Sequence, residues 1–150
     1  MENKRIYVLD TSALIHDPDI FYKLGESEVI VPVPVIKELD GLKRSESLLV
    51  AQAARKVSRE LDLKGSYGDI AGGIKLSTGG ILKVCKDYKI VDGLESQNDN
   101  RIVGAALKIM EETGSRVTIL TTDCNMRNVA RSYGIKAENY PFYLGDDYNR

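Results

Sequence analysis

The sequence predicts a three-layer α/β/α domain with a mainly parallel central sheet. Short apolar segments alternate with longer amphipathic ones, as in proteins whose helices cover both faces of a parallel sheet. Two apolar segments, residues 6–9 and 117–120, lack the strict alternation of a half-exposed strand, which indicates burial on both faces. A glycine-rich stretch, residues 64–93, contains short alternating runs and predicts a strand, or a small hairpin around residues 77–80, at the edge of the sheet.

The composition is that of an ordinary globular domain. The chain has 150 residues, of which 43% are hydrophobic and 29% are charged. No apolar run approaches the ~20 residues of a membrane span, and Asp10 interrupts the only apolar stretch near the N-terminus, so we expect neither a membrane segment nor a secretory signal. Two cysteines are too few for a disulfide framework, which favours a cytoplasmic setting. The net charge of −1 gives no overall attraction to nucleic acid.

In the first half of the chain, strands and helices are predicted to alternate. After the strand at 6–9, residues 11–16 predict a turn or a short helix. Asp17 and Pro18 together predict the start of a helix that ends at Gly25. A strand at 28–32 precedes a helix opened by Pro34. A longer helix follows, from about 45 to 63, whose predicted apolar stripe consists of Leu48, Leu49, Ala53, Val57 and Leu61.

In the second half, a polar loop at 92–97 separates the hairpin from a helix at 98–113, which Gly114 ends. A strand then leads to a helix capped by Asp123, and a last short strand is expected at 135–138. The tail 140–150 is polar and is expected to be loose. We therefore expect one domain at 1–140, and a tail or the start of a linker at 141–150.

Carboxylates are predicted at one edge of the sheet. Asp10 and Asp123 each follow a buried strand, and the carboxyl ends of parallel strands meet at the edge where such folds bind ligands. Asp99 shares the predicted buried stripe of its helix, whereas Glu38 lies at the border of an apolar face. Taken singly, Asp10 and Asp123 are equally well explained as helix caps, and Glu38 is better explained as a solvated charge.

Taken together, the acids indicate a cation site. Several carboxylates brought together repel one another unless a cation lies between them. Hard divalent ions such as Mg²⁺ or Mn²⁺ use one or two carboxylates plus waters and substrate phosphate. The single histidine, His16, and the two cysteines do not have the spacing of a zinc site.

Four motifs, in order, give the chain its resemblance to a known family. They are Val8-Leu9-Asp10-Thr11-Ser12-Ala13-Leu14-Ile15, Pro34-Val35-Ile36-Lys37-Glu38-Leu39-Asp40, Asn98-Asp99-Asn100-Arg101-Ile102 and Thr121-Thr122-Asp123. Over about residues 4–140 the sequence resembles the PIN domain family, and is most similar to PIN domains that precede PhoH-type ATPase modules or RNA-binding modules.

The resemblance implies a Rossmann-like α/β/α sandwich and a metal-dependent endoribonuclease that cleaves single-stranded RNA with a metal-activated water. It implies Mg²⁺ or Mn²⁺ as cofactor, held by a catalytic quartet of Asp10, Glu38, Asp99 and Asp123. No phosphate-binding loop of the G-x-x-x-x-G-K-[ST] type is present, so an ATPase or RNA-binding partner domain would lie outside this chain.

Candidate substrate contacts flank the quartet: Thr11, Lys37, Arg101, Thr121 and Arg127. The basic ones could bind phosphates, although each singly is better explained as a solvated helix charge. Thr121 is equally well explained as a β-branched strand residue. The sequence lacks interleaved aromatic residues for base stacking, so we expect weak RNA binding with little sequence preference.

Two other functions are compatible with the sequence. One is a non-catalytic RNA- or protein-binding module that regulates a larger protein, which the modest charge favours. The other is a toxin ribonuclease of the VapC type with an antitoxin partner, although the hairpin and the Glu38-Leu39-Asp40 motif fit the PhoH-associated type better. PIN-like domains often form homo-oligomers, but the sequence shows no legible interface.

Overall fold

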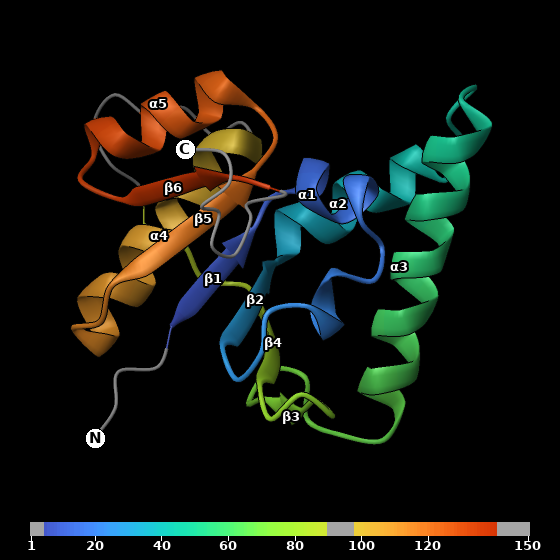
Figure 1. Ribbon diagram of the computed structural model, residues 1–150, viewed down its shortest axis with the longest axis horizontal. Coiled ribbons are helices and arrows are strands. Elements are labelled where there is room, and N and C mark those ends of the chain that lie inside the picture. The colour runs from blue at the N-terminus through green and yellow to red at the C-terminus, as the bar shows by residue number, and fades with distance from the viewer. Residues whose placement is uncertain (1–4, 90–97, 141–150) are drawn as a thin grey trace.

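A computed structural model describes residues 5–89 and 98–140, without the side chains of Asn98 and Asp99 (Figure 1). Its centre is a 6-stranded sheet in the order β3-β4-β2-β1-β5-β6. All strand pairs are parallel except β3–β4, which forms the predicted hairpin with β3 at the edge of the sheet. The helices α1, α2 and α3 gather on one side of the sheet and α4 and α5 on the other (Figure 1). The predicted α/β/α sandwich is confirmed.

The strands are β1 (Ile6–Leu9), β2 (Glu28–Pro32), β3 (Ile74–Lys75), β4 (Ile81–Cys85), β5 (Val117–Thr121) and β6 (Lys136–Asn139). The helices are α1 (Thr11–His16), the 3-10 helix η1 (Ile20–Tyr22), α2 (Val33–Leu42), α3 (Leu48–Ser66), α4 (Asn98–Thr113) and α5 (Cys124–Ser132). All four residues of β1 are buried, as the unbroken apolar run predicted. No described helix combines the length and the apolar character needed to cross a membrane.

The strand order places a topological switch point between β1 and β5. The chain leaves β1 toward β2 on one side of the sheet, whereas β5 continues to β6 on the other, and the two strands pair with Val8 opposite Ile119. Helices that leave neighbouring strands in opposite directions open a crevice at the carboxyl ends of those strands. Asp10 lies directly at this crevice, and its backbone N–H still bonds to Leu120 O at 3.0 Å.

The structure corrects two local predictions. Only the short 3-10 helix η1 forms within residues 17–25, and Asp17 caps the C-terminus of α1 instead of starting a helix. Leu48 and Leu49 were predicted on the apolar stripe of α3 but are 66% and 79% exposed, because the helix begins at Leu48 and its first turn lies beyond the core. The predicted stripe residues Ala53, Val57 and Leu61 are buried, and Ala51 and Ala54 complete the buried face of α3 in place of the two leucines.

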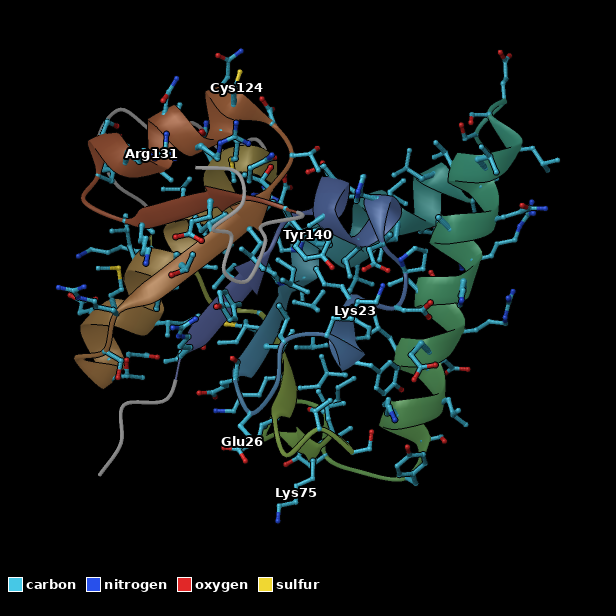
Figure 2. The ribbon with its side chains drawn as sticks, viewed as in Figure 1. Lys23, Glu26, Lys75, Cys124, Arg131 and Tyr140 are labelled. Atoms are coloured by element: carbon cyan, nitrogen blue, oxygen red, sulfur yellow. The ribbon has the colours of Figure 1, made fainter. Side chains whose placement is uncertain are left out.

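Tyr140 also differs from the prediction of a loose tail. It is buried, and its hydroxyl donates a hydrogen bond to Asp17 Oδ2 at 2.6 Å. Figure 2 labels Tyr140 close to α1. Lys23 binds the same carboxylate at 2.9 Å. Tyr140 therefore fastens the end of β6 to α1 across the carboxyl edge. The predicted loop at 92–97 and the rest of the predicted tail lie outside the described residues.

Candidate functional site

A cavity of about 680 Å³ opens at the carboxyl edge of the sheet, between α1, α2 and the β5–α5 turn. Three of the four predicted acids, Asp10, Glu38 and Asp123, contribute to its lining. The complete lining is Asp10, Thr11, Ser12, Ile15, His16, Glu38, Gly41, Leu42, Val50, Thr122 and Asp123. A larger cavity of about 820 Å³ lies along the other side of α2 and contains none of the predicted site residues.

Asp10 forms the buried centre of this edge. It is 6% exposed and caps α1, with its Oδ1 accepting the backbone N–H of Thr11 at 2.8 Å. Its Oδ2 accepts the hydroxyls of Thr121 at 2.6 Å and of Ser12 at 3.1 Å. Asp10 is therefore a helix cap, as the sequence allowed, and it also lines the cavity. Hydrogen bonds from several donors fix the carboxylate in one orientation.

The two hydroxyls around Asp10 are themselves oriented by the β5–α5 turn. Ser12 Oγ accepts the backbone N–H of Thr122 at 3.0 Å, and Thr121 Oγ1 accepts that of Asp123 at 3.0 Å. Because each hydroxyl has one proton, both protons are free to point to Asp10 Oδ2. The network joins residues 109 and 111 positions apart in the sequence.

Glu38 is tied to Asp10 through one residue. The hydroxyl of Thr11 donates a hydrogen bond to Glu38 Oε1, while the backbone N–H of Thr11 bonds to Asp10. Glu38 is half-buried, and it forms no ion pair with any described residue. Thr11, predicted as a substrate contact, therefore has its hydroxyl engaged in holding a carboxylate.

Asp123 is exposed and caps α5, accepting the backbone N–H of Asn125 at 2.9 Å. Within the described part of the chain it has no lysine or arginine partner. Asp99, the remaining acid, begins α4, but its side chain lies outside what the structure describes. Its predicted direction stays a prediction.

The donor chemistry at this edge fits a hard divalent cation, because the polar lining offers mainly carboxylate and hydroxyl oxygens. The described side chains alone do not surround an ion: no three described His, Cys, Asp or Glu residues lie close enough together to hold one. The small number of protein ligands that Mg²⁺ needs reconciles the two observations. Mg²⁺ usually needs only one or two carboxylates from the protein, the rest being waters and phosphate oxygens.

The predicted basic contacts differ from one another. Lys37 is exposed on α2 and does not line the cavity. Arg127 donates to Thr121 O at 3.1 Å and to Asn139 Oδ1 at 3.2 Å, so its described bonds fasten α5 to β5 and β6. Arg101 lies in the first turn of α4 over the ring of Tyr88.

Ser12 and His16 line the cavity although sequence reasoning did not select them. The signal for Ser12 was available, because a hydroxyl two residues after a strand-terminal Asp is placed to bond back to that carboxylate. His16 is exposed at the end of α1, and its ring meets that of Tyr140 edge-on at 6.2 Å. No sequence pattern could have indicated that contact.

Comparisons with known proteins agree on the family. Residues 7–141 match the sequence profile described as "PIN domain". "Protein PhoH2" of Bacillus subtilis is 34% identical over 146 residues, covering 91% of this chain and 33% of that protein. "Protein PhoH2" of Thermobispora bispora is 35% identical over 141 residues, with 91% and 32% coverage. The chain thus spans about a third of the length of these curated relatives.

A solved structure supports the fold. It is described as a domain of a functionally unknown protein from Methanocaldococcus jannaschii, and it superposes with a TM-score of 0.55 at 22% identity over 90% of each chain. This similarity bears on architecture alone. The profile match over most of the chain and the PhoH2 relatives settle the classification: the chain belongs to the PIN domain family.

Proposed function

We propose that this chain is a divalent-metal-dependent endoribonuclease that hydrolyses single-stranded RNA. PIN domains are generally nucleases and generally use divalent metals. The observation that carries the proposal is that acids from three separate segments, Asp10, Glu38 and Asp123, border one cavity at the switch point of the sheet.

In this proposal Asp10, Glu38, Asp99 and Asp123 hold Mg²⁺ or Mn²⁺. When bound, such an ion supplies charge neutralisation of the scissile phosphate and activation of the attacking water. The hydroxyls of Thr121 and Ser12 hold Asp10 in place, and the hydroxyl of Thr11 holds Glu38. Prepositioned acids avoid a reorganisation cost at the moment of reaction.

Basic residues outside the quartet are the proposed contacts to RNA phosphates. Lys37 is exposed and free to meet a phosphate, and Arg101 has a buried Nε–H without an acceptor among the described residues. The absence of a strong net charge favours weak binding by this chain alone. Since the chain spans a third of its PhoH2 relatives, a further domain in the full protein would direct the substrate to the site.

Cleavage of a fluorescent single-stranded RNA with added Mn²⁺ tests the proposal. We expect Asp10→Asn to lower the cleavage rate by about 10²–10³-fold, because it removes one charged group from the reaction centre. Asp62→Asn, an exposed acid on α3 away from this cavity, is the matched control and should retain wild-type activity. Equal activity of wild type and Asp10→Asn would identify the nuclease as a contaminant.

The alternative is a non-catalytic module that binds RNA or a protein. The observation in its favour is that no three described acids, histidines or cysteines are close enough to hold an ion. RNA binding that is unaffected by EDTA, without cleavage in Mn²⁺ or Mg²⁺, would establish this alternative in place of the nuclease.

A further inference from the structure

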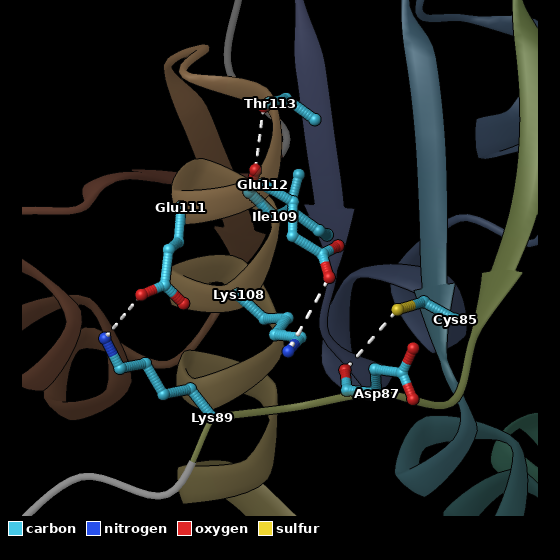
Figure 3. A network of polar contacts seen from close by, with 8 residues as sticks. All are labelled: Cys85, Asp87, Lys89, Lys108, Ile109, Glu111, Glu112 and Thr113. Atoms are coloured by element: carbon cyan, nitrogen blue, oxygen red, sulfur yellow. Dashed lines mark hydrogen bonds and ion pairs between the residues drawn. The ribbon is translucent and has the colours of Figure 1, made fainter.

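The segment that follows β4 is fastened along α4. Lys89 donates its backbone N–H to Gly104 O at 3.0 Å, and its Nζ binds Glu111 at 3.3 Å (Figure 3). Cys85 Sγ donates to Asp87 O at 3.4 Å within the same segment (Figure 3). A Cβ at position 104 would lie 2.4 Å from Lys89 O, so only glycine permits this approach. Tyr88, one residue before Lys89, therefore has a fixed position relative to α4.

Tyr88 holds the guanidinium of Arg101. The guanidinium carbon lies 5.5 Å from the centre of the Tyr88 ring, within the range of a cation–π contact. Arg101 Nε is buried without a hydrogen-bond acceptor. Among the described residues Arg101 has no ion pair and no hydrogen bond, whereas Arg127 donates two hydrogen bonds from a single nitrogen. Arg101 is thus held in place, and its N–H groups have no acceptor among the described residues.

A buried donor without an acceptor among the described residues needs an explanation, because burying a polar group that makes no hydrogen bond is destabilising. The cation–π contact with Tyr88 offsets part of that cost but provides no acceptor. A guanidinium that stacks on an aromatic ring keeps the N–H groups in its plane available, and their fork matches two oxygens of a phosphate.

The position of Arg101 is close to the proposed chemistry. It lies in the first turn of α4, two residues after Asp99. The helix α4 connects β4 to β5, which run in the same direction in the sheet. Its first turn therefore lies at the carboxyl edge of the sheet. α4 also packs against α2, the helix that carries Glu38.

We propose that Arg101, positioned by Tyr88, binds a backbone phosphate of the single-stranded RNA that enters the site. This inference rests on the proposed function and adds a phosphate subsite to it. Tyr88 is a positioning residue: its ring limits the rotamers of Arg101, so less entropy is lost when the phosphate binds. Phosphate contacts fix the register of a strand without reading its sequence.

Binding of a fluorescent single-stranded RNA to the whole chain, measured by anisotropy in EDTA over a range of salt concentrations, tests the subsite. We expect Arg101→Gln to weaken binding about tenfold and to reduce the slope of log K against log salt by about 0.7, the value for one lost contact to a single strand. Arg116→Gln is the matched control, because Arg116 is an exposed arginine just before β5, at the opposite edge of the sheet. It should change neither the affinity nor the slope appreciably.

Two further variants separate positioning from folding. Tyr88→Phe keeps the ring and should bind as wild type does, whereas Tyr88→Leu should weaken binding several-fold. Arg101→Lys keeps both the charge and the cation–π contact, so it should preserve the salt slope but lose several-fold in affinity. If Arg101→Gln behaves like Arg116→Gln while wild type binds RNA, the subsite is refuted and the proposed function stands. If wild type neither binds nor cleaves RNA, both fail.

Discussion

The acids at the ends of β1 and β5 occupy matching places in the sequence but differ in the structure. Both follow a buried strand, and both cap the helix that comes next. Asp10 is 6% exposed and accepts hydrogen bonds from Thr11, Ser12 and Thr121. Asp123 is exposed, and among the described residues its side chain accepts one hydrogen bond, from the N–H of Asn125.

The difference arises from where each strand ends. Asp10 comes directly after Leu9 and still pairs with β5, so its side chain enters the crevice between the two strands. Asp123 comes two residues after Thr121, beyond the ladder. Asp10 therefore both stabilises the fold and lines the cavity. Asp123 lines the cavity too, but it contributes little to the stability of the fold. We therefore expect substitutions of Asp10 to impair both stability and function, and substitutions of Asp123 to impair function with little loss of stability.

The largest expected effect is that of Asp10→Ala on stability. The change leaves the hydroxyls of Ser12 and Thr121 and the N–H of Thr11 without their acceptor in a buried place. We expect a loss of about 3 kcal/mol in the free energy of unfolding, measured by urea denaturation. Asp123→Ala removes a single exposed cap and should cost about 1 kcal/mol.

Thr121→Val serves as the control for this pair. It removes one donor to Asp10 but keeps the shape of a buried β-branched side chain, so its cost should lie between the two aspartate variants. An Asp123→Ala variant that is destabilised as much as Asp10→Ala would contradict the distinction between the two acids.

The effect of Mn²⁺ on stability should also distinguish the roles of these acids. If the acids hold Mn²⁺, an ion concentration of about 100 times the dissociation constant should stabilise the wild type by about 2.7 kcal/mol, since the ion binds the folded chain. Calorimetric titration and the melting temperature would both report it. In EDTA, Asp123→Asn and Asp99→Asn should be as stable as the wild type. In Mn²⁺, both variants should lack the additional stability that the ion gives the wild type.

Asp62→Asn is the control for the titration and should bind Mn²⁺ as the wild type does. If Mn²⁺ stabilised Asp99→Asn as much as the wild type, Asp99 would not belong to the proposed quartet. A gain of the same size in all variants would show that the ion binds elsewhere.

A third carboxylate, Asp17 at the far end of α1, gives the smallest expected effect. Burial alone would raise the pKa of Asp17, but hydrogen bonds from Tyr140 and Lys23 outweigh burial and lower it from the ordinary 3.8. A lowered carboxyl pKa contributes stability above the unfolded pKa, and this contribution is lost as pH falls through the folded value. Tyr140→Phe should therefore cost about 1 kcal/mol at pH 7, measured by urea denaturation.

The same difference should shrink as the pH falls below 3.8 and through the lowered pKa of folded Asp17, where the carboxylate takes up a proton. Contacts of the Tyr140 ring that do not titrate persist in the phenylalanine variant. A difference between the two proteins that stays constant from pH 7 until the Asp17 carboxyl is fully protonated would show that the bond to Asp17 does not contribute.

Elements with a strong local pattern were predicted closely. The helix at 98–113, the strand at 28–32 and the edge hairpin occur as expected, because apolar periodicity and glycine positions are local properties. Gly114 ends α4 in a left-handed conformation, with φ of +70°, as its position predicted, and Gly134, with φ of +80°, does the same after α5.

The errors occurred where tertiary contacts outweigh local signals. The Asp17-Pro18 pair looks like a helix start, but Asp17 is engaged by Lys23 and Tyr140, and only one 3-10 turn follows. Leu48 and Leu49 have the residue type of a core but lie on a turn that extends beyond it. Neither outcome can be read from a window of neighbouring residues.

The order of strands and helices, and hence the appearance of Asp10 and Asp123 at the same edge, was already determined by the sequence, because a parallel sheet collects the ends of its strands on one side. Only the folded chain decided which acid is buried and what holds it. Asp10 owes its surroundings to Thr121, 111 residues away, and Glu38 owes its tether to Thr11. Such partners are chosen by the pairing of β1 with β5 and the packing of α1 on α2, and no local pattern encodes either contact.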